Sequence, residues 1–194
     1  MQNNRTKTAL LLIDVINDLN FPESDAFLQQ GIAASINILN MRNYCHKAEV
    51  PVIYVNDNFG VWRSDFAQVV KHCTSQSSKG SEISNRLVPS ANDYFVLKPK
   101  HSGFYCTSLD PLLEFLMCET LILCGFAGNI CVLFTGNDAY MREYKIVVPA
   151  DCIASNSKTE NDWALLQMST LLKADTRTAG ELIAANFLDS LTDS

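Results

Sequence analysis

The stretch TLILCGFAGNICVLF, residues 120–134, decides the fold of this chain of 194 residues. It begins with five apolar or β-branched residues, turns at Gly125 and Gly128, and then resumes an apolar pattern. A short apolar run that ends in a glycine turn and is followed by helical spacing indicates a buried strand leading into a helix. We therefore expect a strand over residues 120–124 and a helix over Cys131–Glu143.

The same alternation of short strands and longer helices runs through the rest of the chain. Further strands are expected over residues 8–14, 51–56, 94–98 and 145–149, with a weak sixth strand near 174–176. Helices are expected over residues 31–48, 110–118, 158–172 and 179–191. Because the strands are apolar throughout, both faces of the sheet must be covered by helices. We predict one domain over residues 1–194 with a three-layer α/β/α fold and a doubly wound, six-stranded parallel sheet.

Composition and charge exclude several classes of function. Hydrophobic residues make up 47% of the chain and charged residues 19%, which is typical of a soluble globular protein. A net charge of −6 without a cluster of Lys and Arg argues against a nucleic-acid partner. The apolar run over residues 8–13 is too short to span a membrane. Seven cysteines without paired spacing indicate free thiols in a reducing compartment, so we expect a cytoplasmic protein that acts on a small molecule.

Three chemically reactive side chains follow or end predicted strands. Asp14 ends the first strand, Lys98 ends the third, and Cys131 follows the fourth after the glycine turn. Ligands of parallel α/β sheets bind beyond the carboxyl ends of the strands, where these groups would meet. A carboxylate, an ammonium and a thiol at one edge suit a nucleophilic cysteine site. Taken one at a time, each residue also fits a structural role, as a turn cap, a surface lysine or a small buried apolar residue.

Three blocks of the sequence resemble the signature blocks of the isochorismatase-like cysteine hydrolases: LLLIDVINDL (10–19), VLKPKHSGF (96–104) and GFAGNICVLFTGNDAYMREY (125–144). They occur in the expected order and spacing over essentially the whole chain. The resemblance implies a three-layer α/β/α fold and an Asp–Lys–Cys triad, which falls on Asp14, Lys98 and Cys131.

The mechanism that the resemblance implies is covalent. Cys131 attacks the carbonyl of an amide-like bond, Asp14 takes the thiol proton and later activates a water, and Lys98 favours the thiolate. The oxyanion rests on backbone N–H groups of Ala127 and Cys131, beside a cis peptide bond expected at Phe126–Ala127. Because Cys131 would start a helix, we expect a thiol pKa well below the usual value of ~8.5.

No metal and no cofactor are expected. The nicotinamidases of this family carry an Asp-x-His motif after the second strand, whereas this chain reads Asp57-Asn58-Phe59. Without that imidazole, a bound zinc or iron lacks a ligand. His46 and His101 are expected to be surface or loop residues.

The expected substrate is a small amide, ureido or carbamoyl compound. Residues that flank the signature blocks are expected to bind it: Phe21, Trp62, Phe104, Asn129, Ile130 and Phe134. Two alternatives stay open, namely ether hydrolysis of the isochorismatase type, which needs no cysteine, and a thiol-redox or binding protein without turnover. We also expect a homo-oligomer, a dimer or a tetramer, in which residues 57–81 form a lid or a subunit contact.

Overall fold

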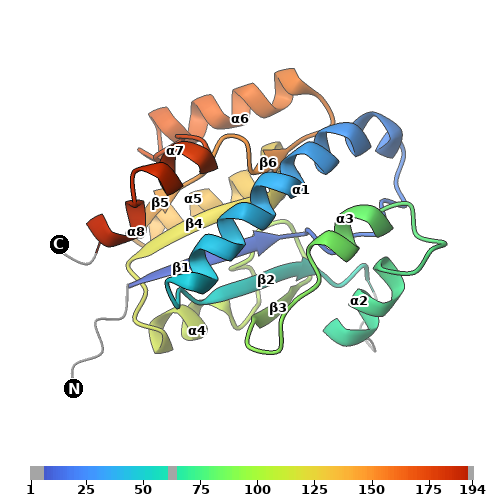
Figure 1. Cartoon of the computed structure of the whole chain (residues 1–194), viewed down its shortest axis with the longest axis horizontal. Coiled ribbons are helices and arrows are strands. Elements are labelled where there is room, and N and C mark those ends of the chain that lie inside the picture. Colours follow the sequence, from blue (N-terminus) through green and yellow to red (C-terminus); the bar gives the residue numbers. More distant parts are fainter. Residues whose placement is uncertain (1–6, 61–64, 192–194) are drawn as a thin grey trace.

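A computed structural model describes residues 7–60 and 65–191 of the chain. Its strands form one parallel sheet in the order β3–β2–β1–β4–β5, and β6 pairs with the end of β4 (Figure 1). The strands are β1 (Thr8–Ile13), β2 (Val52–Asp57), β3 (Tyr94–Lys98), β4 (Thr120–Phe126), β5 (Lys145–Val147) and β6 (Ile153–Ala154). Almost every residue of β1 and β4 is fully buried, because both lie inside the sheet with helices on either side.

Helices cover both faces of the sheet and bury a separate apolar core on each. The first core packs under α1 (Ser24–Lys47), α2 (Phe66–Cys73), α3 (Ser81–Arg86), α7 (Ala179–Ala184) and α8 (Phe187–Ser190). The second packs under α4 (Leu109–Phe115), α5 (Leu133–Met141) and α6 (Lys158–Thr170). This arrangement confirms the predicted three-layer, doubly wound fold.

The centre of the sheet, between β1 and β4, is where the chain changes direction. After β1 it leads to α1 on one face, and after β4 it leads to α5 on the other. In such sheets the divergence opens a crevice at the carboxyl ends of the two strands. Gly125 lies opposite Ile13 in this pair, and a Cβ atom on Gly125 would lie 2.0 Å from the Ile13 carbonyl oxygen. Glycine is therefore required for the two strands to pair beside the crevice.

Two predictions for the C-terminal half are wrong. The sixth strand is β6, Ile153–Ala154, which is too short to leave a sequence pattern, while Asp175 makes only an isolated bridge to Val147. The closing helix is two helices, because Asn186 adopts a left-handed conformation with φ of 47° between them.

Other boundaries move. The helix after β4 begins earlier, as a π-helical turn, η1 (Gly128–Val132), that continues into α5. The first helix begins at Ser24 rather than at residue 31. The segment over residues 57–81, which lacked a predicted element, contains α2, whose first N–H groups are capped by the Asp65 side chain.

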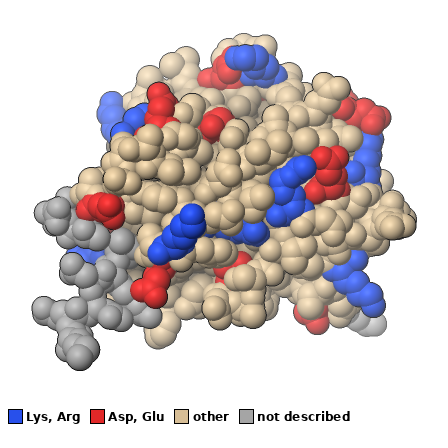
Figure 2. All heavy atoms as spheres, in the orientation of Figure 1, with Lys and Arg blue, Asp and Glu red and all other residues tan. Residues whose placement is uncertain are grey.

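The surface has no single-signed patch on the face shown in Figure 2, where acidic and basic side chains are interspersed. Of the helices within residues 7–60 and 65–191, none combines the length and the hydropathy that a membrane span needs.

Candidate functional site

Lys98 joins the other two predicted triad residues in one cluster. Its Nζ lies 2.8 Å from Asp14 Oδ2 and 3.5 Å from Cys131 Sγ. Lys98 is the last residue of β3, in register with Asp57 on β2, and its side chain spans the width of β2 to reach the end of β1. Lys98 is 0% exposed and Asp14 5%, so two opposite charges are paired in an almost dry site. The three residues thus meet at the carboxyl edge of the sheet, as their strand positions predict.

Backbone and side-chain hydrogen bonds fix the Asp14 carboxylate. The Asp57 N–H donates to Asp14 Oδ1 at 2.7 Å, while Oδ2 pairs with Lys98. The chain leaves Asp14 in a left-handed conformation with φ of 52°. Buried Asn56 then holds the next turn, since its Nδ2 donates to the Ile16 carbonyl at 2.6 Å. Both carboxylate oxygens therefore have defined partners before any substrate binds.

The turn that carries Cys131 is fixed from the α6 side of the molecule. The Asn129 N–H donates to Ser155 Oγ at 3.1 Å, and Ser155 Oγ donates to Asn161 Oδ1 at 2.9 Å. A Cβ atom on Gly128 would lie 2.6 Å from Asn161 Oδ1, so a larger residue there would displace the Asn161 side chain. Cys131 is the fourth residue of this π-helical turn, a local structure that recurs at functional sites.

The start of the same turn contains the expected cis bond, at Phe126–Ala127. The Ala127 carbonyl accepts hydrogen bonds from the N–H groups of Ile130 and Val132, both at 3.1 Å. These bonds tie Ala127, the residue just before the turn, to the residues on either side of Cys131.

The thiol of Cys131 is not the activated thiolate that the sequence predicted. Burial, and after it the Asp14 carboxylate, raise the pKa of Cys131 to about 12, while Lys98 opposes both. The expectation of a lowered pKa is therefore wrong for the free protein: the favourable helix start is outweighed by desolvation and by the neighbouring carboxylate. At neutral pH the thiol keeps its proton and needs a base.

The carboxylate that acts on this thiol belongs to the Asp14–Lys98 pair. Burial raises the pKa of Asp14 above its ordinary value, although Lys98 works in the opposite direction. Burial alone would lower the pKa of Lys98, but the attraction of Asp14 and Cys131 raises it, so the lysine stays charged. A carboxylate with increased proton affinity next to a protonated thiol suits proton transfer from sulfur to oxygen.

His101 is a residue at the site that the sequence reasoning missed. Its Nδ1 lies 3.9 Å from Cys131 Sγ, and its ring lies 5.6 Å from the Phe134 ring, at an angle of 52°. It was interpreted as a surface or loop residue, and it is indeed exposed. The signal that could have found it is its place in the second signature block, three residues after Lys98.

The residues expected to bind substrate divide into two groups. Ile130 and Phe134 flank Cys131 and are exposed, so they are free to meet a ligand. Asn129 belongs to the same turn, and its Oδ1 is buried without a hydrogen-bond partner among the described residues. Phe104 is instead a core residue: it is 6% exposed and stacks 6.2 Å from Tyr144, because its ring points into the second apolar core.

Of the two remaining expected residues, the structure describes only Phe21, which packs away from the triad residues. Phe21 contacts Phe27 edge-to-face at 6.1 Å and lines a shallow hollow with Asp18 and His72. Trp62 lies outside the described residues.

A metal site finds no support in the described part of the chain. Within residues 7–60 and 65–191, no group of three or more His, Cys, Asp or Glu side chains is arranged to hold a metal ion. His72 pairs with Asp18 at 3.0 Å and His46 with Asp93 at 2.8 Å.

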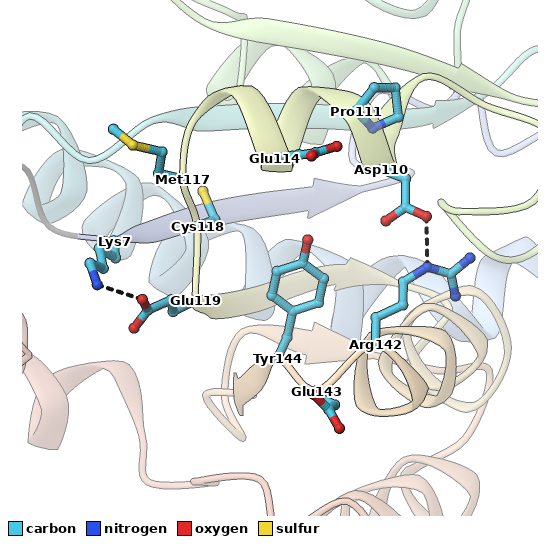
Figure 3. A pocket seen from close by; sticks show the side chains of 10 residues that line it. All are labelled: Lys7, Asp110, Pro111, Glu114, Met117, Cys118, Glu119, Arg142, Glu143 and Tyr144. Atoms are coloured by element: carbon cyan, nitrogen blue, oxygen red, sulfur yellow. Dashed lines mark hydrogen bonds and ion pairs between the residues drawn. The ribbon is translucent and has the colours of Figure 1, made fainter.

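A hollow of about 830 Å³ lies at the opposite edge of the sheet (Figure 3). Its lining includes Lys7, Glu119 and Tyr144, each just before the amino end of a strand. The figure shows its charges engaged with one another, since Lys7 pairs with Glu119 and Arg142 pairs with Asp110. This hollow shares no residue with the triad, so its volume does not mark the reactive site.

Known proteins are similar in sequence over nearly all of this chain. The isochorismatase domain family matches residues 8–180. The isochorismatase family protein YaaI of Bacillus subtilis is 43% identical over 90% of this chain and 96% of its own length.

Two further proteins have amidohydrolase names. A ureidoacrylate amidohydrolase, RutB, of Methylorubrum extorquens is 45% identical over 65 residues, which are 34% of this chain and 26% of its own. An N-carbamoylsarcosine amidase from Thermoplasma acidophilum superposes with a TM-score of 0.65 at 25% identity, over 89% of this chain and 96% of its own. The match over residues 8–180 and the identity with YaaI lead to one conclusion: this chain belongs to the isochorismatase family of hydrolases.

Proposed function

We propose that this protein is a cysteine-dependent hydrolase of a small amide, ureido or carbamoyl compound, acting through a covalent acyl-enzyme. The observation that carries the proposal is the contact network of Lys98, whose Nζ lies 2.8 Å from a buried carboxylate and 3.5 Å from the Cys131 sulfur. A buried charge pair lowers the free energy of unfolding unless the pairing and further hydrogen bonds compensate for the lost hydration. Ionisable groups with perturbed pKa values cluster at functional sites.

Acylation starts from the protonated thiol. Asp14 accepts the thiol proton as Cys131 Sγ attacks the substrate carbonyl carbon, and Lys98 stabilises the negative charge that develops on the sulfur. The tetrahedral intermediate then collapses, the C–N bond breaks, and the proton passes from Asp14 to the departing nitrogen. The products of this half-reaction are an amine or ammonia and a thioester on Cys131, which water hydrolyses to the acid.

The oxyanion of the tetrahedral intermediate needs hydrogen-bond donors. We assign this role to the backbone N–H groups of Ala127, just before the turn that presents the sulfur, and of Cys131, its fourth residue. Preorganised backbone donors stabilise an oxyanion without a reorganisation cost during the reaction. Asn129, Ile130 and Phe134 belong to or follow this turn and are proposed to contact the substrate.

The names of two similar proteins support the substrate class. Ureidoacrylate amidohydrolase and N-carbamoylsarcosine amidase both hydrolyse C–N bonds by name. The first matches only 65 residues of this chain, so the bond type is carried over as a proposal and the substrate is not.

The test is mass spectrometry after acid quenching of the protein with a panel of small amides, ureido compounds and carbamoyl compounds. We expect hydrolysis of at least one of them and an acyl mass on the peptide that contains Cys131. The matched control is Cys106→Ala, which removes an exposed cysteine and should leave both results unchanged. Absence of hydrolysis and of any adduct across the panel would contradict the proposal.

The Cys131→Ala variant separates the alternatives. Loss of hydrolysis in this variant supports the covalent mechanism. Hydrolysis at the wild-type rate would instead indicate ether hydrolysis of the isochorismatase type, which needs no cysteine. A wild-type protein that only undergoes reversible oxidation at Cys131, without hydrolysis, would indicate a thiol-redox or binding protein.

We also propose that the protein assembles as a homo-oligomer in the cytoplasm. The helices α5 and α6 pack together and expose large apolar side chains, namely Phe134, Met141, Trp163 and Leu166. Such side chains on adjacent helices favour contact with a second copy. Light scattering of the purified protein tests this: a dimer or tetramer supports the proposal, and a monomer at all concentrations contradicts it.

A further inference from the structure

The sulfur of Cys131 has two different sides. On its inner side lie Lys98 and Asp14, both almost completely buried. On its outer side lies the exposed imidazole of His101, with Nδ1 at 3.9 Å from the sulfur. Imidazole is the side chain used most often in general acid–base catalysis, and nothing in the acylation half-reaction above uses it.

The position of His101 relative to the sulfur is fixed by the residues that follow it. Ser102 Oγ donates to Asp138 Oδ2 at 2.5 Å, and the Gly103 N–H donates to Thr135 Oγ1 at 3.0 Å. Thr135 Oγ1 in turn donates to the Cys131 carbonyl at 2.7 Å. The loop that carries His101 is therefore tied to α5 at Asp138 and at Thr135, and Thr135 is in turn bonded to Cys131.

Asp14 is poorly placed to activate the water that must hydrolyse a thioester. Its Oδ1 accepts from the Asp57 N–H at 2.7 Å and its Oδ2 pairs with Lys98 at 2.8 Å. Its side chain is only 7% exposed, so water arriving from solvent meets the outer side of the sulfur first. That is the side on which His101 lies.

We propose that His101 is the general base for deacylation, which rests on the proposed covalent mechanism. The His101 Nδ1 accepts a proton from a water as the water oxygen bonds to the thioester carbonyl carbon. The C–S bond then breaks, the acid leaves, and the proton passes from His101 to the Cys131 sulfur. The overall step consumes one water and one thioester and yields one carboxylic acid and one thiol.

The simpler role for His101 is packing against Phe134 as part of the pocket wall. Two variants distinguish the roles. His101→Phe keeps an aromatic ring against Phe134 and removes both nitrogens, and His101→Gln keeps a hydrogen-bonding group and removes the base.

The experiment uses p-nitrophenyl acetate, an activated ester whose leaving group needs no proton. All variants are made in a Cys106→Ala background, which removes the exposed thiol as a competing nucleophile. In the starting protein we expect a burst of one p-nitrophenolate per Cys131, followed by steady turnover. In His101→Phe and His101→Gln we expect the same burst, which shows that the site is folded, and a steady rate lower by roughly 10²-fold or more. Hydroxylamine, which attacks the thioester without a base, should restore that rate.

The matched control is His72→Gln, since His72 pairs with Asp18 away from the sulfur. It should leave both the burst and the steady rate unchanged. A steady rate in both His101 variants equal to that of the starting protein would overturn the role of His101, as would a loss that hydroxylamine does not restore. Absence of a Cys131-dependent burst in the starting protein would instead overturn the covalent mechanism itself, so the two failures are distinguishable.

Discussion

The two edges of the sheet each hold a lysine–carboxylate pair and a cysteine, and they differ in how far the charged pair is buried. At the carboxyl edge, Lys98 and Asp14 are buried, with side chains 0% and 7% exposed. At the amino edge, Lys7 and Glu119 pair at 2.5 Å with side chains 63% and 56% exposed. Although its distance is shorter, the Lys7–Glu119 pair is the weaker interaction. Water screens its exposed charges, and its two long side chains lose conformational freedom on pairing.

The cysteines at the two edges differ in the charged groups that act on them. Burial raises the pKa of Cys118 at the amino edge to about 11, without a charged group acting on it. Burial raises the pKa of Cys131 to about 12, and there a carboxylate and an ammonium act on the sulfur in opposite directions. The two cysteines share a raised pKa, and what sets Cys131 apart is the buried carboxylate and ammonium held against its sulfur.

The largest expected difference between the edges is in activity. Cys131→Ala should lower turnover by at least about 10⁴-fold, because it removes the nucleophile. Cys118→Ala, at the hollow of Figure 3, should leave turnover unchanged. Steady-state kinetics on a hydrolysed substrate from the amide panel measures both. Loss of activity in Cys118→Ala with retention in Cys131→Ala would reverse the assignment of the two edges.

The next difference is in stability. Lys98→Met should lower the free energy of unfolding by about 3–5 kcal/mol, because it leaves the Asp14 carboxylate buried without its partner. Lys7→Met should cost less than about 1 kcal/mol, as is usual for exposed pairs. Urea denaturation of both variants measures the free energy of unfolding. Equal decreases in the two variants would mean that burial does not determine how much a charge pair contributes to stability.

The loss in Lys98→Met should depend on pH. Burial raises the pKa of Asp14, and Lys98 opposes that rise. Without Lys98, the pKa of Asp14 should therefore rise further. A carboxyl whose pKa is raised on folding contributes its stability at low pH and loses it as the pH rises. The variant should therefore approach wild-type stability in acid and fall behind it toward neutral pH, and the opposite trend would contradict the electrostatic account.

A smaller effect is expected from the strand pair beside the crevice. Gly125→Ala should cost about 3 kcal/mol, because φ there is 129° and the new Cβ would lie 2.0 Å from the Ile13 oxygen. The control, Gly180→Ala in α7, has no heavy atom within 4 Å of its Cβ and should stabilise the helix by up to about 1 kcal/mol. Thermal unfolding of the pair measures the difference, and similar melting temperatures would show that the two strands can separate without cost.

The sequence was sufficient to predict the carboxyl edge because the end of an apolar strand is a local pattern. Asp14 and Lys98 each end an apolar run, and parallel strands place such residues at one edge. The two-residue strand β6 leaves no such pattern, and neither does the break at Asn186, whose left-handed φ interrupts an otherwise helical composition.

The electrostatics of the site could not be predicted from the same patterns. The start of a helix favours a thiolate, but the pKa of Cys131 depends on how completely its surroundings exclude water and on the position of the Asp14 oxygens. His101 was missed for a related reason: its distance to the sulfur is set by the bonds of Ser102 and Gly103 to α5, which join segments about thirty residues apart.

The central claim is that Asp14 acts as a base on a thiol that is protonated at rest, and a thiolate titration tests it most directly. The ultraviolet absorbance of the Cys131 thiolate is obtained by subtracting the spectrum of Cys131→Ala at each pH. We predict no thiolate signal from Cys131 at pH 8 in the wild type, and a titration at lower pH in Asp14→Asn, because the carboxylate raises the thiol pKa. A full thiolate signal in the wild type at pH 8, or a titration moved upward in Asp14→Asn, would contradict the claim.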